Sequence, residues 1–150
     1  IRGDNYPDTR GAQYDLGTMY SLGWGVLTNH RETVKWWRKS AEQGLSQAQT
    51  SLGRMYSTGR GILRDYKEAV KWWRKSAEQG DSSAQYYLGK MYKEGRGVTQ
   101  DYVMAHMYFN ISVVNGSHIA IRERGSIEDE MTLSQIAEAQ KLAREWMRTH

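Results

Sequence analysis

Apolar residues return along the chain at intervals of three and four, which is the spacing of one face of a helix. In the first such stretch Ala12, Leu16, Met19 and Tyr20 fall at positions i, i+4, i+7 and i+8, so they form one apolar stripe. Gly17 lies beside this stripe, although glycine in a helix interior costs about 1 kcal/mol relative to alanine. We expect another helix to approach closely at that point.

The same pattern recurs twice at an offset of 36 residues. Residues 12–44 and 48–80 are identical at 22 of 33 positions, and residues 84–116 match the second copy at 14 of 33 positions. Self-similarity at such a period is typical of solenoids, in which each repeat is one supersecondary unit. We predict an all-α fold, an α/α solenoid of three 36-residue helix-hairpin repeats within a single domain. The predicted repeats span about 12–47, 48–83 and 84–116 of the domain 1–150.

The second helix of each repeat has clear end signals. Asn29, Asp65 and Asp101 are favourable N-caps at equivalent positions, and Glu32 and Glu68 lie three residues further on, as in a capping box. A glycine follows each helix in the position of a C′ residue. The predicted helices span about 31–43, 67–79 and 103–115, and each is expected to bury the equivalents of Val34, Trp36 and Ala41.

The two ends of the chain depart from the repeat. Residues 117–150 lack the Gly-x-Gly pairs, and they predict a C-terminal capping helix pair. Its first helix is expected at about 118–130, and its second begins at a capping box of Thr132 and Gln135 and runs to about Met147. Residues 1–10 are mostly polar and are expected to form a loose lead-in.

The repeated string Ala-x3-Leu-Gly-x-Met-Tyr-x2-Gly-x-Gly, followed by Asp-Tyr-x2-Ala-x2-Trp and Ser-Ala-Glu-Gln-Gly, resembles the Sel-one-like repeat (SLR) family. That family is a branch of the tetratricopeptide-like solenoids. The resemblance covers about residues 12–116, and residues 131–146 look like the closing helix of bacterial members. It implies a bacterial, non-enzymatic adaptor that holds a partner protein on a curved surface. As an alternative, some members resemble immunity proteins that block secreted lipase-type toxins.

Composition limits the compartment and the chemistry only in part. No run of 18 apolar residues is present, so no segment is expected to span a bilayer. The chain has no cysteine, which excludes a thiolate metal site and departs from the disulfide-stapled members of the family. It begins at Ile1 rather than methionine, as a processed chain does, and a removed signal peptide would leave no trace. The compartment stays open, with a periplasmic or secreted location favoured over a cytoplasmic one, and we expect a monomer rather than an obligate oligomer.

Catalytic signals are absent from the sequence. His30, His106, His118 and His150 show neither metal-ligand nor triad spacing. The Gly-x-Gly pairs are interpreted as hairpin turns, because a phosphate-binding loop needs a preceding strand that is not predicted here. We therefore predict no enzymatic activity, no cofactor and no metal.

Nucleic-acid binding is a second alternative, because the net charge is +4 and the segments 35–39 and 71–75 interleave cations with paired tryptophans. Neighbouring helical residues point about 100° apart, so both tryptophans of a pair cannot share one exposed face. The third copy, at 107–111, keeps aromatic size but loses the positive charge. This pattern favours packing over nucleic-acid contact.

A partner protein is expected on the first helices of the repeats, which line the concave side of such solenoids. Positions that repeat are taken as packing positions, and positions that vary are free to specify a ligand. We single out Tyr86 and Tyr87 as an exposed pair with no packing role inside their own repeat. The candidate binding residues are Tyr14, Asp15, Thr18, Leu22, Thr50, Ser51, Arg54, Thr58, Tyr86, Tyr87, Lys90 and Glu94.

Overall fold

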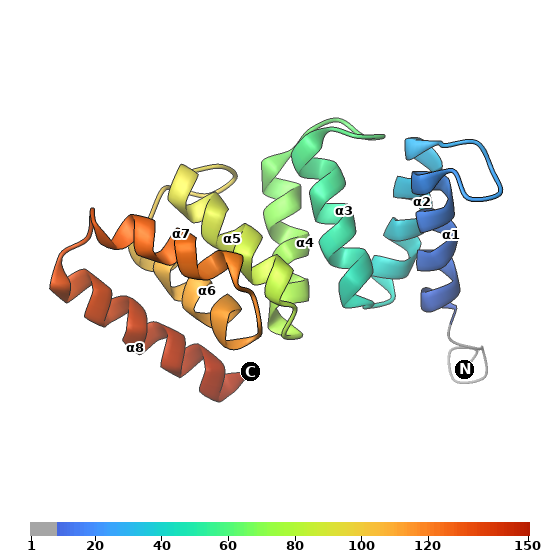
Figure 1. Ribbon diagram of the computed structural model, residues 1–150. Helices are drawn as coiled ribbons and strands as arrows, with labels where there is room; N and C mark the ends of the chain where they lie inside the picture. Colours follow the sequence, from blue (N-terminus) through green and yellow to red (C-terminus); the bar gives the residue numbers. More distant parts are fainter. Residues whose placement is uncertain (1–8) are drawn as a thin grey trace.

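The computed structural model describes residues 9–150, which form eight helices and no strand (Figure 1). The helices are α1 (Arg10–Leu22), α2 (His30–Glu42), α3 (Ser46–Thr58), α4 (Tyr66–Glu78), α5 (Ser82–Glu94), α6 (Tyr102–Val114), α7 (Ile119–Glu128) and α8 (Leu133–Thr149). The predicted all-α solenoid of helix hairpins with capping helices is confirmed. Most of the predicted lead-in, residues 1–8, lies outside the described part of the chain.

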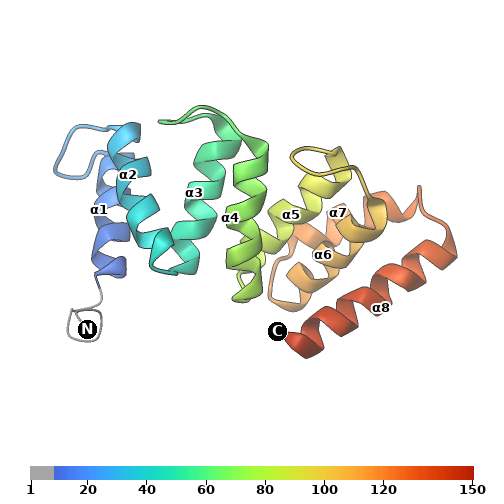
Figure 2. The ribbon, with the colours of Figure 1, turned by 180° about the vertical axis from the view of Figure 1, so that it is seen from behind.

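The hairpins α1–α2, α3–α4 and α5–α6 follow one another along the molecule, and each also packs on the next through α2 with α3 and α4 with α5. The loops that join the two helices of each hairpin lie along one edge of this array, as both views show (Figures 1 and 2). Helices α7 and α8 both pack on α6. Helix α8 runs obliquely back along the array, so the C-terminus lies near the end of α4 (Figure 2).

The ends of these helices lie within one or two residues of the predictions, and one predicted cap is not formed as expected. Helix α2 begins one residue before the predicted start, and the Asn29 side chain accepts hydrogen bonds from the backbone of Arg31 and Glu32. The predicted capping box is not closed, because the Asn29 backbone N–H donates instead to the carbonyl of Tyr20 at 3.0 Å. Glu32 turns towards Lys35 at 4.0 Å. At the start of α8, by contrast, the predicted capping box is fully formed.

The recurring glycine in the first helix of each hairpin makes room for an aromatic side chain of the second helix. A Cβ atom on Gly53 would collide with the Trp73 indole, and Gly17 faces Trp37 in the same way. With this close approach, the Trp73 Nε1 donates to the backbone carbonyl of Thr50 at 3.1 Å. The prediction of a close helix–helix contact at these glycines is confirmed.

The structure corrects which tryptophan of the first pair belongs to the core. Trp36 was expected to be buried, but it is half-buried, and Trp37 packs into the core instead. The reason is the glycine of helix α1, which faces Trp37 rather than Trp36. In the second copy both Trp72 and Trp73 are buried.

Helix α8 explains why the third copy loses its cations. Helices α2 and α4 carry solvent-exposed cations such as Lys35 and Lys71, but Met107 occupies the equivalent position in α6 and is buried. Leu142 and Trp146 of α8 lie beside Met107 and join the same hydrophobic core. A charged side chain at that position would lose its hydration without gaining a partner.

Helix α7 stands where the first helix of a fourth hairpin would stand. Ala120 and Gly125 follow Ala84 and Gly89 at an offset of 36 residues, and Ala120 is fully buried. The fully buried His106 of α6 contacts Glu128 of α7 through its Nε2 atom at 2.8 Å. This histidine therefore has a packing role within the array.

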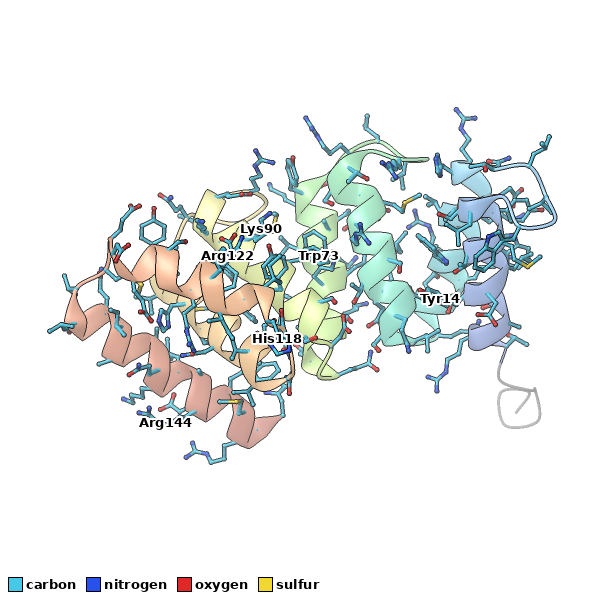
Figure 3. All side chains as sticks on the ribbon, in the orientation of Figure 1. Tyr14, Trp73, Lys90, His118, Arg122 and Arg144 are labelled. Atoms are coloured by element: carbon cyan, nitrogen blue, oxygen red, sulfur yellow. The ribbon has the colours of Figure 1, made fainter. Side chains whose placement is uncertain are left out.

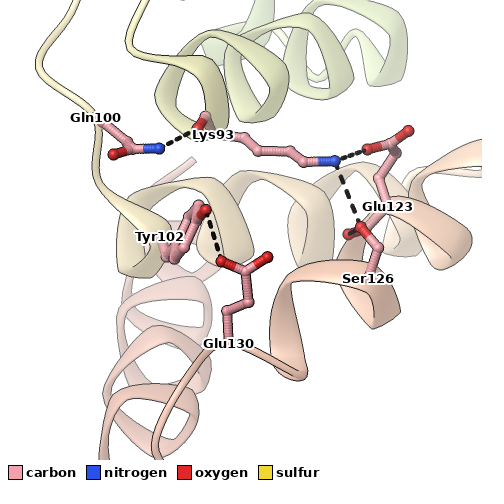
Figure 4. A network of polar contacts seen from close by, with 6 residues as sticks. All are labelled: Lys93, Gln100, Tyr102, Glu123, Ser126 and Glu130. Carbon is pink, nitrogen blue, oxygen red and sulfur yellow. Dashed lines mark hydrogen bonds and ion pairs between the residues drawn. The ribbon is translucent and has the colours of Figure 1, made fainter.

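A polar network attaches α7 to α5 at the loop edge (Figure 4). Lys93 of α5 forms an ion pair with Glu123 at 2.9 Å and donates to Ser126 at 3.4 Å. Tyr102 donates to Glu130 at 3.1 Å, and hydrogen bonding to that carboxylate raises the pKa of the Tyr102 phenol. Together these contacts hold the end of the array in one arrangement.

Candidate functional site

Two hollows lie next to each other along the face of the first helices α1, α3 and α5. The Tyr87 hollow, of about 220 Å³, is lined by Tyr14, Gln47, Thr50, Ser51, Arg54, Asp81, Ser83 and Tyr87. The Trp37 hollow, of about 170 Å³, is lined by Ser21, Trp37, Ser51, Arg54, Met55, Thr58 and Arg60. Along this face Tyr14 lies towards one end of the array and Lys90 towards the other (Figure 3).

Arg54 of α3 stands between the two hollows and lines both. Its guanidinium group lies 5.9 Å from the centre of the Tyr87 ring, a distance at which a cation is attracted to an aromatic face. The residue is exposed and has no ion-pair partner among residues 9–150. Its donors are therefore accessible for an acceptor from outside the chain.

Lys90 is a second cation that lies over a tyrosine ring, one hairpin further along and within its own helix α5. It occupies the position equivalent to Arg54 and lies 5.8 Å from the centre of the Tyr86 ring. Within the described part of the chain it too has no carboxylate partner. Burial, and after it the carboxylate of Glu123, raises the pKa of Tyr86 above its ordinary value of 10.0, so the phenol stays neutral.

Tyr86 and Tyr87 are not the exposed pair that the sequence predicts, and Tyr86 has a packing role inside its own hairpin. Both are half-buried. Tyr87 stacks on Trp73 of the preceding hairpin with ring centres 4.8 Å apart, and Tyr86 lies 6.0 Å from Phe109 of its own hairpin. The glycines of the first helices cause this, because they bring the large aromatic residues of the second helices up to the neighbouring positions.

Thr50 lines the Tyr87 hollow but offers little surface to a partner. It is buried, with 8% of its surface exposed. Its hydroxyl group shares hydrogen bonds with Ser76 at 2.6 Å and Asp81 at 2.5 Å. These contacts join α3 to α4 and to the start of α5, so this side chain serves the stacking of the hairpins.

The remaining candidate residues divide into two groups. Tyr14, Ser51 and Thr58 line the hollows, with Tyr14 stacked on Trp37 at 5.8 Å. The others lie outside both hollows: Asp15, Leu22 and Glu94 are exposed and Thr18 is half-buried. Glu94 is 3.7 Å from Arg96, and the Thr18 hydroxyl donates to the Tyr14 carbonyl at 3.0 Å.

Several residues of the hollows were missed by the sequence reasoning. Trp37 recurs as Trp73, so it was assigned to packing alone, although one edge of it lines a hollow. Arg60 stands between the two glycines of a hairpin turn, a position that varies from Trp24 to Arg60. That variation is a signal in the sequence, but it lies in a turn, outside the first-helix positions from which the binding residues are predicted.

Other kinds of site find little support in the described residues. Between residues 9 and 150 no three His, Asp or Glu side chains are grouped as metal ligands would be. No described helix is both long and apolar enough to cross a membrane. Trp37 and Trp73 are buried and cannot stack on bases, and Lys39 lies over Trp36 at 4.6 Å. The paired tryptophans thus serve packing more than a nucleic-acid surface.

The stacked hairpins, with two hollows along the face of their first helices, define a helical-repeat protein of the tetratricopeptide-like class. Residues 11–45, 46–81 and 82–112 each match the model of the Sel1 repeat. The chain belongs to the Sel1 repeat family. The matched segments begin up to two residues before the predicted repeats.

Solved structures agree with this assignment. A protective antigen of uropathogenic Escherichia coli with an SLR fold is 35% identical, with a TM-score of 0.81 over 91% of this chain, which spans 30% of that antigen. A Sel1 repeat protein from Oxalobacter formigenes is 35% identical, with a TM-score of 0.72 over 78% of this chain and 88% of its own. Cysteine-rich protein B of Helicobacter pylori shares the fold at 22% identity, with a TM-score of 0.64 over 75% of this chain and 86% of its own. The comparison with curated proteins gave no match.

Sel1 repeats generally form scaffolds for protein–protein interaction, and proteins built from them are typically non-enzymatic. The family thus supports protein partners for this chain as a class.

Proposed function

We propose that this chain is a monomeric, non-enzymatic scaffold that binds a partner protein on the face of α1, α3 and α5, with Arg54 as the central contact. The supporting observation is the position of Arg54 between two open hollows, held over Tyr87 and without an acidic partner among the described residues. Arginine in such a setting offers a planar set of donors to a carboxylate or carbonyl group. Arginine and tyrosine are also enriched at the energetic centres of interfaces.

The chemistry of the face favours a partner with acidic side chains. Arg54 and Lys90 stand at equivalent positions of successive hairpins, and each lies over a tyrosine ring. Ser51 and Ser83 add hydroxyl groups to the Tyr87 hollow. A partner segment that lies along the array would meet two cations one hairpin apart. The carboxylate that lines the Tyr87 hollow, that of Asp81, already accepts hydrogen bonds from the Thr50 hydroxyl and the Ala84 backbone N–H.

Replacing Arg54 and Lys90 together with alanine is expected to weaken partner binding at least tenfold, which corresponds to about 1.4 kcal/mol. Neither residue belongs to the hydrophobic core, so the fold should persist. The partner is first identified by affinity capture from the native organism, and its dissociation constant is then measured by calorimetry with the purified proteins.

The matched control is Lys71→Ala, which removes an exposed cation from the outer helix α4. It should leave the affinity within about twofold, since surface charges far from an interface contribute little. Equal affinities for the parent and the Arg54/Lys90 variant would rule out this face. A loss that is equally large with Lys71→Ala would point to general electrostatic attraction instead.

An immunity protein against a secreted lipase-type toxin is a finer form of the same proposal. It predicts that affinity capture yields one dominant partner, a lipase, in a stoichiometric complex whose enzymatic activity is blocked. A broader adaptor predicts a non-lipase partner that binds through the same Arg54 face.

A further inference from the structure

The side of α1 that points away from α3 carries residues whose equivalents in α3 and α5 are mostly buried. Ala48 and Leu52 of α3 are fully buried, and so are the equivalent Ala84 and Leu88 of α5. Their counterparts in α1 differ only in environment: Ala12 is exposed and Leu16 is half-buried. Helices α3 and α5 each pack on the second helix of the preceding hairpin, whereas no described helix occupies that place beside α1.

A hydrogen bond between hairpins is likewise present at the other two interfaces and has no counterpart at α1. The Gln49 side-chain amide donates to the backbone carbonyl of Ala41 in the preceding hairpin at 3.2 Å, and Gln85 donates to Ala77 at 3.1 Å. Gln13 stands at the same position of α1. Within the described chain its amide has no carbonyl of a preceding helix to reach.

The turn glycines are a third, independent observation that α1 lacks the neighbour that α3 and α5 have. Gly61 and Gly97 have φ angles of +70° and +73°, and a Cβ atom on either would collide with the backbone at the start of the preceding hairpin's second helix, at His30 and Tyr66 respectively. Gly25 has the same φ angle of +73°, but nothing lies within 4 Å of its Cβ position. It has the shape needed for a close backbone contact that the described residues do not make.

We propose that this face of α1, formed by Ala12, Gln13, Leu16, Tyr20 and Gly25, is a stacking surface for the second helix of a further Sel1-type hairpin. The argument is continuity with two interfaces already present, α2 with α3 and α4 with α5. The incoming helix would supply a backbone carbonyl to Gln13 and the backbone of its first turn to Gly25. It would also carry a cation over Tyr20, as Arg38 lies 5.6 Å from the centre of the Tyr56 ring.

A second copy of this chain is not a suitable occupant. The stacking side of α2 is covered by α3 and that of α4 by α5, while α6 is covered by both α7 and α8. A copy therefore has no second helix left to offer. The stacking face is also separate from the Arg54 face, so this proposal does not depend on the proposed function.

The test compares the 150-residue chain with an extended chain, in which a copy of residues 46–81 replaces residues 1–9 directly before Arg10. This junction keeps the 36-residue register, because Arg10 corresponds to Ser46 and Ser82. Leu16→Ala and Leu52→Ala are made in both chains, and the urea midpoint is measured. In the original chain Leu16→Ala should lower the midpoint by less than half as much as Leu52→Ala. In the extended chain the two losses should become equal, and the added hairpin should resist proteolysis.

Gly25→Ala and Gly61→Ala form a second matched pair. They share the same backbone strain, so the difference between their midpoint shifts reports the contact with a preceding helix. Gly25→Ala should be the milder change in the original chain and equal to Gly61→Ala in the extended one. An added hairpin that is cleaved freely, or a Leu16→Ala loss that does not grow, contradicts the proposal. So does concentration-dependent dimerisation of the original chain that Leu16→Asp abolishes, because the occupant would then be a second copy.

Discussion

Replacing Trp73 with alanine is expected to lower the free energy of unfolding by about 3–5 kcal/mol, the range for truncation of a large core aromatic residue. Trp73 is 1% exposed, fills the space beside Gly53 and stacks on Tyr87 at 4.8 Å. Its loss also leaves the backbone carbonyl of Thr50 without its indole donor. Urea denaturation followed by circular dichroism measures the loss, which is a large fraction of the roughly 5–15 kcal/mol that stabilises a typical folded domain.

The control for this experiment is Trp36→Ala. Trp36 is half-buried on the outer side of α2, where Lys35 and Lys39 lie over its ring at 5.4 and 4.6 Å. Its truncation should cost about 1 kcal/mol or less, since it opens no internal cavity. A Trp36→Ala loss as large as that of Trp73→Ala would show that the core is assigned to the wrong tryptophan.

Replacing Gly53 with alanine should also destabilise the protein, by about 1–3 kcal/mol, although alanine is the better helix former. The added methyl group would overlap the Trp73 indole, which is enclosed on its other sides and cannot move away without disturbing Tyr87. The free energy of unfolding is again obtained from urea denaturation.

Gly125→Ala is the matched control, and its effect on the free energy of unfolding should be opposite in sign. Gly125 occupies the same register position in α7, but nothing lies within 4 Å of its Cβ position. Without a steric cost the helix propensity of alanine dominates, and the variant should be more stable by about 0.5–1 kcal/mol. If Gly53→Ala is stabilising as well, the close approach of Trp73 does not require glycine.

Most of the fold could be predicted from the repeats because stacking imposes the same requirement on each hairpin. The N-caps, the C′ glycines and the mid-helix glycines recur for reasons that act locally, so one copy confirms another. The error at Trp36 arose because its neighbour Trp37 is also a tryptophan. Spacing alone could not show which of two adjacent aromatic residues faces a glycine on a different helix.

The candidate site was less predictable because variation between copies has two causes. Arg54 and Lys90 vary, and Arg54 is exposed while Lys90 is half-buried, as expected for residues that contact a partner. Thr50 and Tyr86 vary as well, but each compensates for a different neighbour inside the array, Asp81 in one case and Phe109 in the other. When the packing partner of a position changes from hairpin to hairpin, the residue at that position varies between copies, just as a residue that binds a ligand does.

Because α8 packs on α6, the last hairpin is more constrained in evolution than the hairpins before it. Hairpins α1–α2 and α3–α4 are nearly interchangeable, since 22 of 33 aligned positions coincide. Unequal recombination can therefore add or delete such a unit and still leave interfaces between hairpins that fit. The α5–α6 unit cannot be exchanged in this way, because its Met107 and Tyr108 are fitted to the closing helix. Gains and losses of repeats in this lineage should therefore be found upstream of α5, with the last hairpin and its closing helix inherited together.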